Sequence, residues 1–395
     1  MKKRILVSGG GIAGLTAARL LYNQGHDVTV IDRAKQFNKS GFLVSLKSFG
    51  VEIMDELGLT KALRKESTPS EFMDWMNANG TMIRSISYKK VNQNTSQSIL
   101  ITRGALHNVL YDNIKSDIPV LFDTTIEDLQ QQAQKVNIRL SNGTLIEADL
   151  VIVSEGLRSS TRTKYFPGSQ LEDFNLLYMG GRLSTRHAYR LGTIRTYLDI
   201  RKMLSIYPVS KEEVALQCYI HSVDDISKIH AEAPQLLKDS FKDYNTEVQD
   251  LIRRFLEGGL MFADKMGMVH TPNLVHGNVV LLGDAGYCPT ALSGMGASLS
   301  IYGAKVLSHF LAQLPDGLNE ALQRYNSLMQ PIISKFQGNA RNNARSFIPD
   351  NEADLKRFTA LFGSATEDEV SRMMTDQLVL TENQLKFLPI HSNET

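Results

Sequence analysis

Three glycines near the N-terminus have the type and spacing that bind the pyrophosphate of a dinucleotide. They are Gly9, Gly11 and Gly14, and they follow directly on the apolar run Ile5–Ser8. The first glycine permits a tight turn, the second lets a pyrophosphate approach the backbone, and the third lets a helix pack closely on a strand. The sequence therefore predicts a phosphate-binding turn between a strand and a helix.

The helix expected after this turn begins near Ile12 and Ala13, and its free N–H groups would face the phosphates. Apolar residues at helical spacing continue to Tyr22, and a second apolar run then ends at Asp32. Asp32 is placed to accept a hydrogen bond from a ribose hydroxyl, and Arg33 is placed to pack over an adenine. The alternative for Arg33 is a solvated side chain. These residues predict a dinucleotide site, with NAD and FAD both possible.

A second carboxylate stands in a similar position much later in the chain. Asp284 follows Gly283 at the end of the apolar run Val279–Leu282. Such a carboxylate can hold the ribityl hydroxyls of FAD, and a helix that opens at the next glycine pair directs its positive end toward the negative charge of a reduced flavin. The alternative is a simple β-turn followed by a loop. The residues expected to line the flavin from this segment are Pro289, Gly294, Met295 and Gly296.

A third apolar run between these motifs also ends beside an acidic residue. Leu150–Val153 precedes Glu155, with Ser159 and Arg162 downstream. In this order, the three motifs resemble those of the class A flavoprotein monooxygenases, the para-hydroxybenzoate hydroxylase-like group, whose central motif is DGxxSxxR. The resemblance covers roughly residues 1–340 and implies FAD rather than NAD. Glu155 replaces the usual Asp, and a purely structural network is the alternative for Ser159 and Arg162.

Two further segments match the same family. Arg103 and Leu106 match an Arg and a Leu that open a helix beside the cofactor. The resemblance therefore implies that Arg103 lies against the ribityl or phosphate part of FAD, and a surface Arg at a helix start is the alternative. Residues 40–45 match a glycine-containing segment near the flavin, and Lys47 just after it is either a substrate-side or a solvent residue.

The chain departs from the family at several positions near the late motif. Ser298 stands where an Asn is usual, Gly303 and Ala304 replace an Asp-Ala pair, and Tyr287 replaces a His. The resulting string GDAGYCPTALSGMGASLS is similar to a narrower branch, the tetracycline destructases of soil and Legionella-like type and related oxidoreductases that act on polyketides.

The apolar runs and the family resemblance predict an α/β fold. We expect a Rossmann-like FAD-binding domain, a β-sheet-containing substrate domain of the para-hydroxybenzoate hydroxylase-like kind, and C-terminal helices. The FAD-binding domain is expected to be discontinuous, because strands at both ends of the substrate segment must join one sheet. The expected segments are 1–71, 100–173 and 271–340 for the FAD-binding domain, 72–99 and 174–270 for the substrate domain, and 341–395 for the C-terminal helical segment.

The expected strand Val214–Ile220 alternates between two faces, and either face could line the substrate pocket. His221, just beyond it, is interpreted as a solvent or turn residue rather than a catalytic base. The two faces carry Leu216, Cys218 and Ile220 on one side and Gln217, Tyr219 and His221 on the other.

The composition argues against several other classes of protein. Among 395 residues, 43 Lys and Arg balance 42 Asp and Glu, and the formal net charge of +1 makes nucleic acid an unexpected partner. No apolar run approaches the length of a membrane span, and the first run is too short for a signal peptide. Cys218 and Cys288 have no metal-ligand spacing, so we expect reduced thiols and no metal. A cytoplasmic, monomeric protein with no membrane partner is expected.

The resemblance implies an FAD-dependent monooxygenase that consumes NADPH or NADH and O2. In this chemistry a flavin C4a-hydroperoxide transfers its distal oxygen, so no side chain is expected to be a catalytic residue, and the protein orients substrate and excludes water. The expected substrate is a polycyclic phenol or enol, and inactivation of tetracycline antibiotics is the leading hypothesis. Two alternatives stay open: a hydroxylase or epoxidase of another aromatic polyketide or quinone, and a non-catalytic flavin-binding or antibiotic-sequestering protein.

Overall fold

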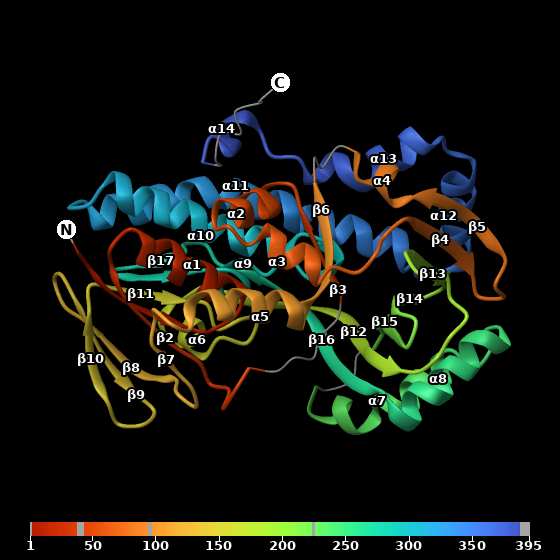
Figure 1. Ribbon diagram of the computed structural model, residues 1–395, viewed down its shortest axis with the longest axis horizontal. Helices are drawn as coiled ribbons and strands as arrows, with labels where there is room; N and C mark the ends of the chain where they lie inside the picture. The colour runs from red at the N-terminus through yellow and green to blue at the C-terminus, as the bar shows by residue number, and fades with distance from the viewer. Residues whose placement is uncertain (1, 38–42, 94–96, 223–225, 388–395) are drawn as a thin grey trace.

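The computed structural model describes residues 2–37, 43–93, 97–222 and 226–387, whose helices and strands are shown in Figure 1. The expected α/β fold is confirmed, because a mainly parallel sheet packs against helices and a larger sheet lies beside it. Residues 40–42 of the glycine-containing segment lie outside the described residues. Within the described ranges, no helix combines the length and the apolar character needed to cross a membrane.

A six-stranded sheet forms the centre of the part of the molecule in which the sequence predicts a dinucleotide site, called the nucleotide-binding part below. Strand β1 lies inside it, with β11 and β2 running parallel to it on either side. All four residues of β11 are buried, as expected for a parallel sheet covered on both faces. In their order across the sheet, the strands are β17 (Val275–His276), β18 (Val279–Leu281), β11 (Leu150–Val153), β1 (Arg4–Ser8), β2 (Asp27–Ile31) and β7 (Val120–Leu121).

Helices cover this sheet through apolar faces that the sequence pattern predicts. In the first of them, Leu15, Ala18 and Leu21 are completely buried. This helix packs against the long helix that follows the late glycine pair. The helices of this part are α1 (Ile12–Asn23), α2 (Phe49–Glu56), α3 (Thr60–Lys65), α5 (Arg103–Ile114), α6 (Ser160–Tyr165), α9 (Asp284–Tyr287), the 3-10 helix η2 (Ala291–Ser293) and α10 (Gly296–Gln313).

Two small sheets were not anticipated from the sequence. One is a three-stranded antiparallel sheet beside the six-stranded one, and the other is a two-stranded ribbon. Val136, Ile138 and Leu140 alternate with more exposed residues, so period-two alternation was the available signal for the first. The strands are β8 (Ile126–Gln131), β9 (Val136–Leu140) and β10 (Leu145–Ala148) in the first sheet, and β3 (Leu43–Lys47) and β6 (Ser98–Thr102) in the ribbon.

A seven-stranded sheet forms the other half of the molecule. Helices α7 (Ile226–Ser240) and α8 (Thr246–Gly258) cover one face, where Leu216, Cys218 and Ile220 join their apolar core. Tyr219 and Gln217 therefore lie on the opposite face. In order across the sheet, the strands are β16 (Leu260–His270), β12 (Gln170–Ser184), β15 (Glu213–His221), β14 (Lys202–Ser210), β13 (Thr193–Asp199), β4 (Phe72–Asn77) and β5 (Met82–Ser87).

A single 30-residue helix, α11 (Leu318–Phe347), contacts both large sheets. Near its beginning, the Tyr325 hydroxyl donates a hydrogen bond to the Leu281 carbonyl of β18 at 3.0 Å. At its end, the Phe347 ring stacks on Trp75 of β4, with ring centroids 5.3 Å apart. The helix continues through Pro331, whose neighbours Ile332 and Ile333 are buried.

The C-terminal helices that follow α11 lie on the same side of the molecule as α11 (Figure 1). Arg84 of β5 donates to the Phe362 carbonyl at 3.0 Å, and Ser371 donates to the Val91 carbonyl at 3.1 Å. In the nucleotide-binding part, the Tyr302 hydroxyl of α10 donates to the Gln384 carbonyl of α14 (Glu382–Leu385) at 2.6 Å. The other elements involved are α4 (Tyr88–Val91), α12 (Glu352–Ser364), α13 (Glu367–Thr375) and the 3-10 helix η3 (Asp376–Leu378).

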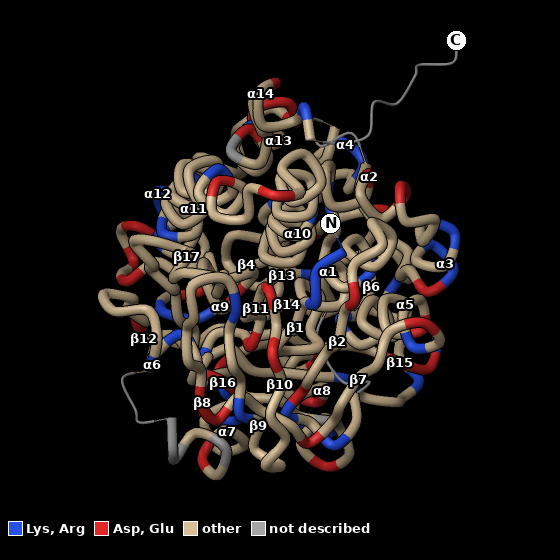
Figure 2. Tube along the Cα trace, turned by 90° about the vertical axis from the view of Figure 1, so that its left-hand side faces the viewer, with Lys and Arg blue, Asp and Glu red and all other residues tan. Residues whose placement is uncertain are grey.

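Charged side chains of both signs are mixed over the surface. In the view of Figure 2, Lys and Arg are interspersed with Asp and Glu. Several form ion pairs between distant segments, for example Arg19 with Asp117 at 2.8 Å and Arg341 with Glu172 at 2.5 Å. The mixed pattern agrees with the formal net charge of +1.

Two of the departures from the family pattern are coupled by packing. The Tyr287 side chain is 1% exposed, and its hydroxyl lies 2.0 Å from the position that a Cβ on Gly303 would occupy. The tyrosine in α9 therefore requires a residue without a side chain in the facing turn of α10. Tyr287 in place of His and Gly303 in place of Asp form a matched pair.

Replacing Gly303 with Ala should destabilise the fold, because the new methyl group would overlap the Tyr287 hydroxyl. Overpacking of this kind costs about 1–3 kcal/mol of unfolding free energy, which urea unfolding measures. Adding Tyr287→Phe should recover part of this loss, since the nearest remaining ring carbon lies at 3.2 Å. Strictly additive losses in the double variant would contradict the proposed coupling.

Candidate active site

The glycine turn has the geometry that the sequence predicts. Gly9 has a φ of +105°, and a Cβ on it would lie 2.4 Å from the Ser154 carbonyl oxygen. A Cβ on Gly14 would lie 2.0 Å from the Gly9 carbonyl oxygen, so α1 packs too closely here for a side chain. No atom lies within 4 Å of the corresponding position on Gly11. Gly11 therefore borders open space, where a pyrophosphate is expected.

The beginning of α1 leaves backbone donors available at this open space. Gly11 is the N-cap residue of the helix, and no side chain caps it. Ile12 and Ala13 form the first turn, whose N–H groups have no acceptor inside the helix. The positive end of the helix dipole adds to their attraction for an anion. The arrangement suits a phosphate group.

Asp32 lies at the same turn, at the end of β2. Its carboxylate accepts hydrogen bonds from the backbone N–H groups of Gly10, at 2.7 Å, and Ala34, at 2.8 Å. These two bonds hold the carboxylate against the glycine turn, and each oxygen keeps a further lone pair for a ribose hydroxyl. Arg33 is exposed, and the described contacts do not place it on an adenine site.

The central motif is a hydrogen-bond network that supports this turn. One oxygen of the Glu155 carboxylate accepts from the hydroxyls of Ser8, at 2.6 Å, and Thr161, at 2.7 Å. The other accepts from the Ser159 hydroxyl at 2.7 Å and the Thr161 N–H at 3.2 Å. Four donors thus surround one carboxylate and fix the end of β1 to the beginning of α6.

Two neighbours extend this network to the other motifs. The Ser154 hydroxyl donates to the Gly9 carbonyl at 2.8 Å. The buried Arg162 guanidinium donates to the Ala285 carbonyl in α9 at 3.1 Å. These contacts favour the structural interpretation of Ser159 and Arg162. The central motif links the glycine turn to the segment that carries the late carboxylate.

The late carboxylate lies next to the glycine turn. A Cβ on Gly283, which has a φ of +65°, would lie 2.7 Å from the Ala13 Cβ in the first turn of α1. Asp284 follows immediately and opens α9. Burial raises the pKa of the Asp284 carboxyl, and the positive charge of Arg103 opposes this rise. Arg103 is exposed and acts electrostatically on Asp284. That both residues hold one cofactor stays a prediction.

The late glycine pair also borders open space. Gly294 has a left-handed backbone with a φ of +64°, and no atom lies within 4 Å of a Cβ built on it. Near Gly296 the only such neighbour is a Pro289 ring carbon at 4.0 Å. Met295 is buried and is the N-cap residue of α10, which no side chain caps. Thr290, between the two motifs, has a φ of +65°, a strained conformation of the kind that clusters at functional sites.

One residue at this site was missed by the sequence analysis. The His107 ring in α5 donates from Nε2 to the Gly10 carbonyl at 2.6 Å, and it packs against Phe37 in a T-shaped arrangement with ring centroids 4.3 Å apart. Burial lowers the pKa of His107, so the ring is favoured in its neutral form. Its position four residues after Arg103 was the available signal, since residues four apart share a helix face.

The face of the seven-stranded sheet opposite α7 and α8 carries tyrosines and is called the tyrosine face below. The C-terminal helices cover part of it, since Tyr219 lies in a buried cluster with Phe362 and Val370. Tyr178 and Tyr219 stack with ring centroids 5.0 Å apart, and the Gln217 amide donates to the Tyr219 hydroxyl at 2.5 Å. Burial raises the pKa of Tyr207 to about 12, with the nearby Tyr88 as a further cause. Burial raises the pKa of Tyr178, and the positive charge of Arg103 opposes this rise. The face offers aromatic surface and neutral hydroxyl donors.

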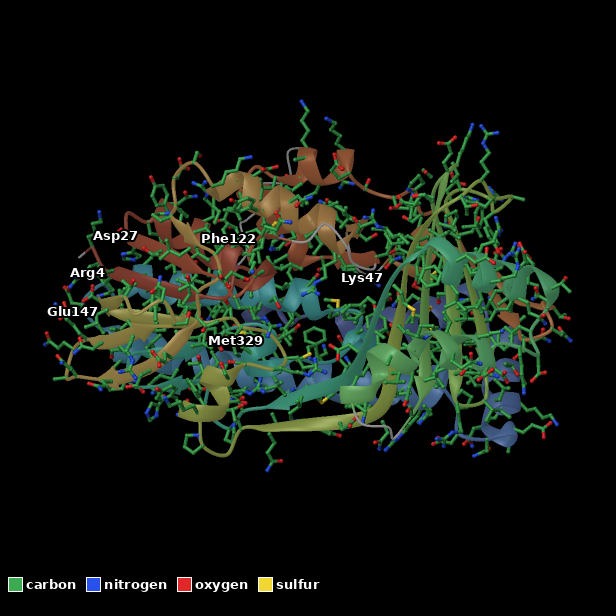
Figure 3. The ribbon with its side chains drawn as sticks, turned by 90° about the horizontal axis from the view of Figure 1, so that it is seen from below. Arg4, Asp27, Lys47, Phe122, Glu147 and Met329 are labelled. Carbon is green, nitrogen blue, oxygen red and sulfur yellow. The ribbon has the colours of Figure 1, made fainter. Side chains whose placement is uncertain are left out.

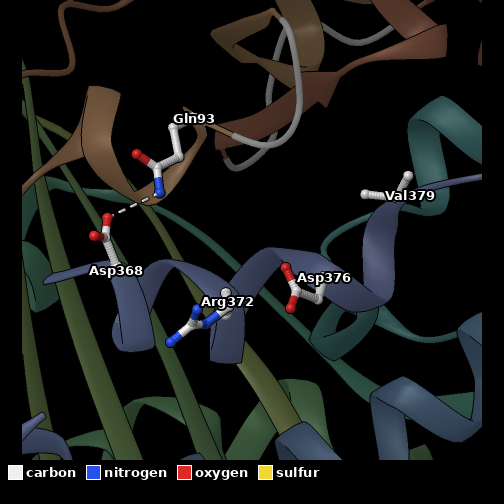
Figure 4. Close-up of a pocket in the computed structure, with 5 residues that line it drawn as sticks. All are labelled: Gln93, Asp368, Arg372, Asp376 and Val379. Carbon is white, nitrogen blue, oxygen red and sulfur yellow. Dashed lines mark hydrogen bonds between the residues drawn. The ribbon is translucent and has the colours of Figure 1, made fainter. Parts of the chain in front are cut away.

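Other candidate positions lie away from these motifs. His221 has its Nε2 atom 3.6 Å from Asp350, and burial lowers its pKa, so it is a strand-end residue. A surface pocket of about 470 Å³ lies beside α13 (Figure 4). A second pocket, of about 910 Å³, lies beside α10 and α11. Neither pocket is lined by a motif residue, and the first is lined by Gln93, Asp368, Arg372, Asp376 and Val379.

The described residues fit an elongated flavin dinucleotide. Open space at Gly11 and Gly294 lies at the uncapped beginnings of α1 and α10. Asp284 lies between these two openings along the chain. It directly follows Gly283, which lies against α1, and it precedes the segment that leads to α10. Helix N-termini suit a pyrophosphate at one end and the electron-rich edge of a reduced ring at the other.

Comparison with known proteins also indicates FAD binding, over most of the chain. The FAD binding domain family matches residues 2–340. A flavin-dependent monooxygenase from Legionella longbeachae serogroup 1 (strain NSW150) is 27% identical over 348 residues, which cover 85% of this chain and 87% of the relative. A flavin-dependent monooxygenase from an unknown prokaryotic organism is 28% identical over 355 residues, which cover 88% and 91%.

Two solved structures show that the same fold extends into the C-terminal helices. The crystal structure of tetracycline destructase Tet(55) has a TM-score of 0.79 and 23% identity, covering 96% of this chain and 99% of that one. Klebsiella pneumoniae HpxO, crystallised with FAD and uric acid, has a TM-score of 0.85 and 20% identity, covering 95% and 96%.

Substitution at two glycines of the same motif should separate cofactor binding from folding. Gly11→Val should lose FAD without loss of stability, because the new side chain enters open space that the pyrophosphate needs. Gly14→Val should lose both, because its Cβ would overlap the Gly9 backbone. Flavin absorbance after gel filtration and thermal unfolding of the FAD-free proteins measure the two effects. Normal flavin retention by Gly11→Val would exclude the proposed phosphate site.

Asp284→Ala should release FAD, because a charge-assisted contact to ribityl hydroxyls contributes about 1.5–3 kcal/mol. Equilibrium titration with FAD measures the loss as a dissociation constant roughly tenfold to a hundredfold higher. Asp316→Ala, at an exposed position before α11, is the matched control. Equal FAD affinity in the two variants would contradict the role of Asp284.

The isosteric Asp284→Asn variant tests burial of the same carboxyl group in the FAD-free protein. Because the folded-state pKa is raised, the stability that Asp284 contributes is present below its ordinary pKa of 3.8 and is lost as pH rises through the folded value. Asp284→Asn should therefore be more stable than wild type at neutral pH, and the difference should vanish toward pH 3. A constant difference across this range would contradict the raised pKa.

Proposed function

Because this chain belongs to the FAD binding domain family and is an FAD-dependent monooxygenase, we propose that it oxidises polycyclic phenols or enols and inactivates tetracycline antibiotics. The observation that carries this proposal is the tyrosine face beside the cofactor motifs. Tyr178 stacks there on the buried Tyr219, and the positive charge of Arg103 acts on Tyr178. A broad hydroxylated ring system matches it.

The protein's own residues bind and orient in this reaction. Gly11 and the beginning of α1 would hold the pyrophosphate, Asp284 the ribityl hydroxyls, and the beginning of α10 the pyrimidine edge of the ring. The bound flavin, reduced by NADPH or NADH, would supply the activated oxygen. The sheet and the C-terminal helices would exclude water, which is what this chemistry asks of the surrounding protein.

The similarity to Tet(55) supports the choice of substrate, because it extends over 96% of this chain and thus into the C-terminal helices. In this chain, α12 packs on the substrate-side sheet through Trp75 and Phe362, whose ring centroids lie 5.1 Å apart. We therefore place α12 and α13 near the entrance for substrate. A smaller hydroxylated ring is the second candidate, favoured by the similarity to HpxO crystallised with uric acid.

Purified holoenzyme supplied with NADPH and air should bleach the near-ultraviolet absorbance of tetracycline and chlortetracycline. Oxygen insertion breaks the conjugated enol system, so mass spectrometry should find products that have gained one oxygen atom. An anaerobic reaction and a reaction without NADPH are the controls. Stable tetracycline absorbance, together with rapid NADPH oxidation in the presence of uric acid or a simple phenol, would replace the leading substrate with the second candidate.

A further inference from the structure

Lys47 lies where the nucleotide-binding part meets the seven-stranded sheet (Figure 3). It is the last residue of β3, and its cross-strand partner in β6 is Ser98. Because side chains alternate along a strand, Lys47 and Ser45 point to the same side of the β3–β6 ribbon. Leu46, between them, points the other way into the core of the nucleotide-binding part.

The side of the ribbon that carries Lys47 is turned toward the seven-stranded sheet. The Tyr88 hydroxyl lies 3.0 Å from the Ser45 hydroxyl and also hydrogen-bonds with Ser98, the residue opposite Lys47. Tyr88 belongs to a small apolar cluster that includes Ile194 of β13. Tyr207 of β14, on the tyrosine face, packs against this same cluster. Lys47 therefore shares its side of the ribbon with the substrate-side sheet.

The backbone of Lys47 is fixed to the flavin end of the candidate site. Its N–H donates to the Ser298 hydroxyl at 3.1 Å, and that hydroxyl donates back to the Lys47 carbonyl at 3.3 Å. Ser298 stands in the first turn of α10, two residues after Gly296. The next residue, Ser48, has a φ of +45°, a conformation that costs energy without glycine. The chain thus holds Lys47 beside the beginning of α10 at some cost in backbone strain.

The ammonium group of Lys47 has an unusual environment. The residue is half-buried, and burial lowers its pKa to about 8. Burial is the sole cause of this shift among the described residues, so neither a carboxylate nor a second cation contributes. The titratable groups on its side of the ribbon include the Tyr88 and Tyr207 hydroxyls, and burial raises the pKa of both. Helices α2 and α10 also contact β3 and carry Glu52, Asp55, Glu56, Lys305 and His309, none of which is a cause of the lowered pKa of Lys47. A partly desolvated cation without an acidic partner carries an unfavourable desolvation free energy. An anion that binds beside it offsets this cost.

We propose that Lys47 is a substrate-binding residue, whose ammonium group pairs with an ionised phenolic or enolic oxygen of a ring held between the β3–β6 ribbon and the tyrosine face. The proposal rests on the proposed function for its reaction type, because an aromatic ring or enol must be electron-rich to accept oxygen from the flavin. An adjacent cation favours the ionised, electron-rich form of such a substrate. The assignment does not depend on tetracycline being that substrate.

The test uses holoenzyme without NADPH, so that ligand binds without turnover, and 4-nitrophenol as the probe, whose phenolate is yellow and whose phenol is not. Wild type should bind the phenolate and lower the pH at which the probe ionises. Lys47→Met should weaken phenolate binding about tenfold or more, since a charge-assisted hydrogen bond is lost. Lys47→Arg should keep most of the affinity. Binding of 4-nitroanisole, which cannot ionise, should be the same in all of these proteins.

Lys335→Met is the matched control, because burial lowers the pKa of that lysine as well, yet it lies in α11 and donates to the Val379 carbonyl. It should bind the probe as wild type does. Equal phenolate affinity in wild type and Lys47→Met, or equal absence of binding, would overturn the proposal. An equal loss of 4-nitroanisole binding in Lys47→Met would also overturn it, because the effect would then be structural.

Tetracycline turnover in the same proteins separates the two proposals. If wild type does not oxidise tetracycline but binds 4-nitrophenolate through Lys47, the assignment of Lys47 stands and tetracycline is not the substrate. If wild type and Lys47→Met oxidise tetracycline with the same kcat/KM at every pH, the assignment of Lys47 is overturned and the substrate stands. A raised KM in Lys47→Met with rescue by Lys47→Arg supports both.

Discussion

Both ends of the cofactor site depend on the hydrogen bonds that the Glu155 carboxylate accepts. It accepts four hydrogen bonds, from Ser8 at the end of β1 and from Ser159 and Thr161 at the beginning of α6. Hydrogen bonds to a charged group contribute about 1.5–3 kcal/mol each, and removal of the acceptor would leave several donors unpaired. Through Arg162 the same network reaches α9, so the glycine turn and the late carboxylate are positioned by one cluster. The side chain is one methylene longer than the Asp usual in the family, and it spans from β1 to α6.

Much of the nucleotide-binding part could be predicted because its signals are local. The spacing of Gly9, Gly11 and Gly14 defines a turn within a few residues, and the short apolar runs that precede it and end at Asp32 indicate buried strands. The strand containing Leu216 and Cys218 was predicted for the same reason. Which face of this strand borders the substrate depends on where α7 and α8 pack, and alternation within a strand carries no such information. His107 was missed because its partner, the Gly10 carbonyl, lies 97 residues away in the chain.

The positions at which this chain departs from its family are explained by contacts rather than by chemistry. Ser298 replaces an Asn and bonds both the N–H and the carbonyl of Lys47, and a Cβ on Gly50 would lie 2.6 Å from its hydroxyl. A longer side chain at position 298 would therefore displace α2. In the same way, the Tyr287 side chain occupies the space that a side chain at position 303 would need. Substitutions that seem independent in the sequence are thus pairwise adjustments of the packing between α10 and its neighbours, which single-position comparison cannot reveal.

Helix α11 has a consequence for how the molecule can open. Its 30 residues span about 45 Å at the usual rise per residue, and its ends are bonded to β18 in one sheet and stacked on β4 in the other. Because α11 is held at both ends, it prevents the two sheets from separating by a hinge motion. Exchange of bulky molecules must then proceed by local displacement of short segments, at rates set by those segments. We expect ligand release to be insensitive to solvent viscosity, which slows large domain motions but has less effect on small ones.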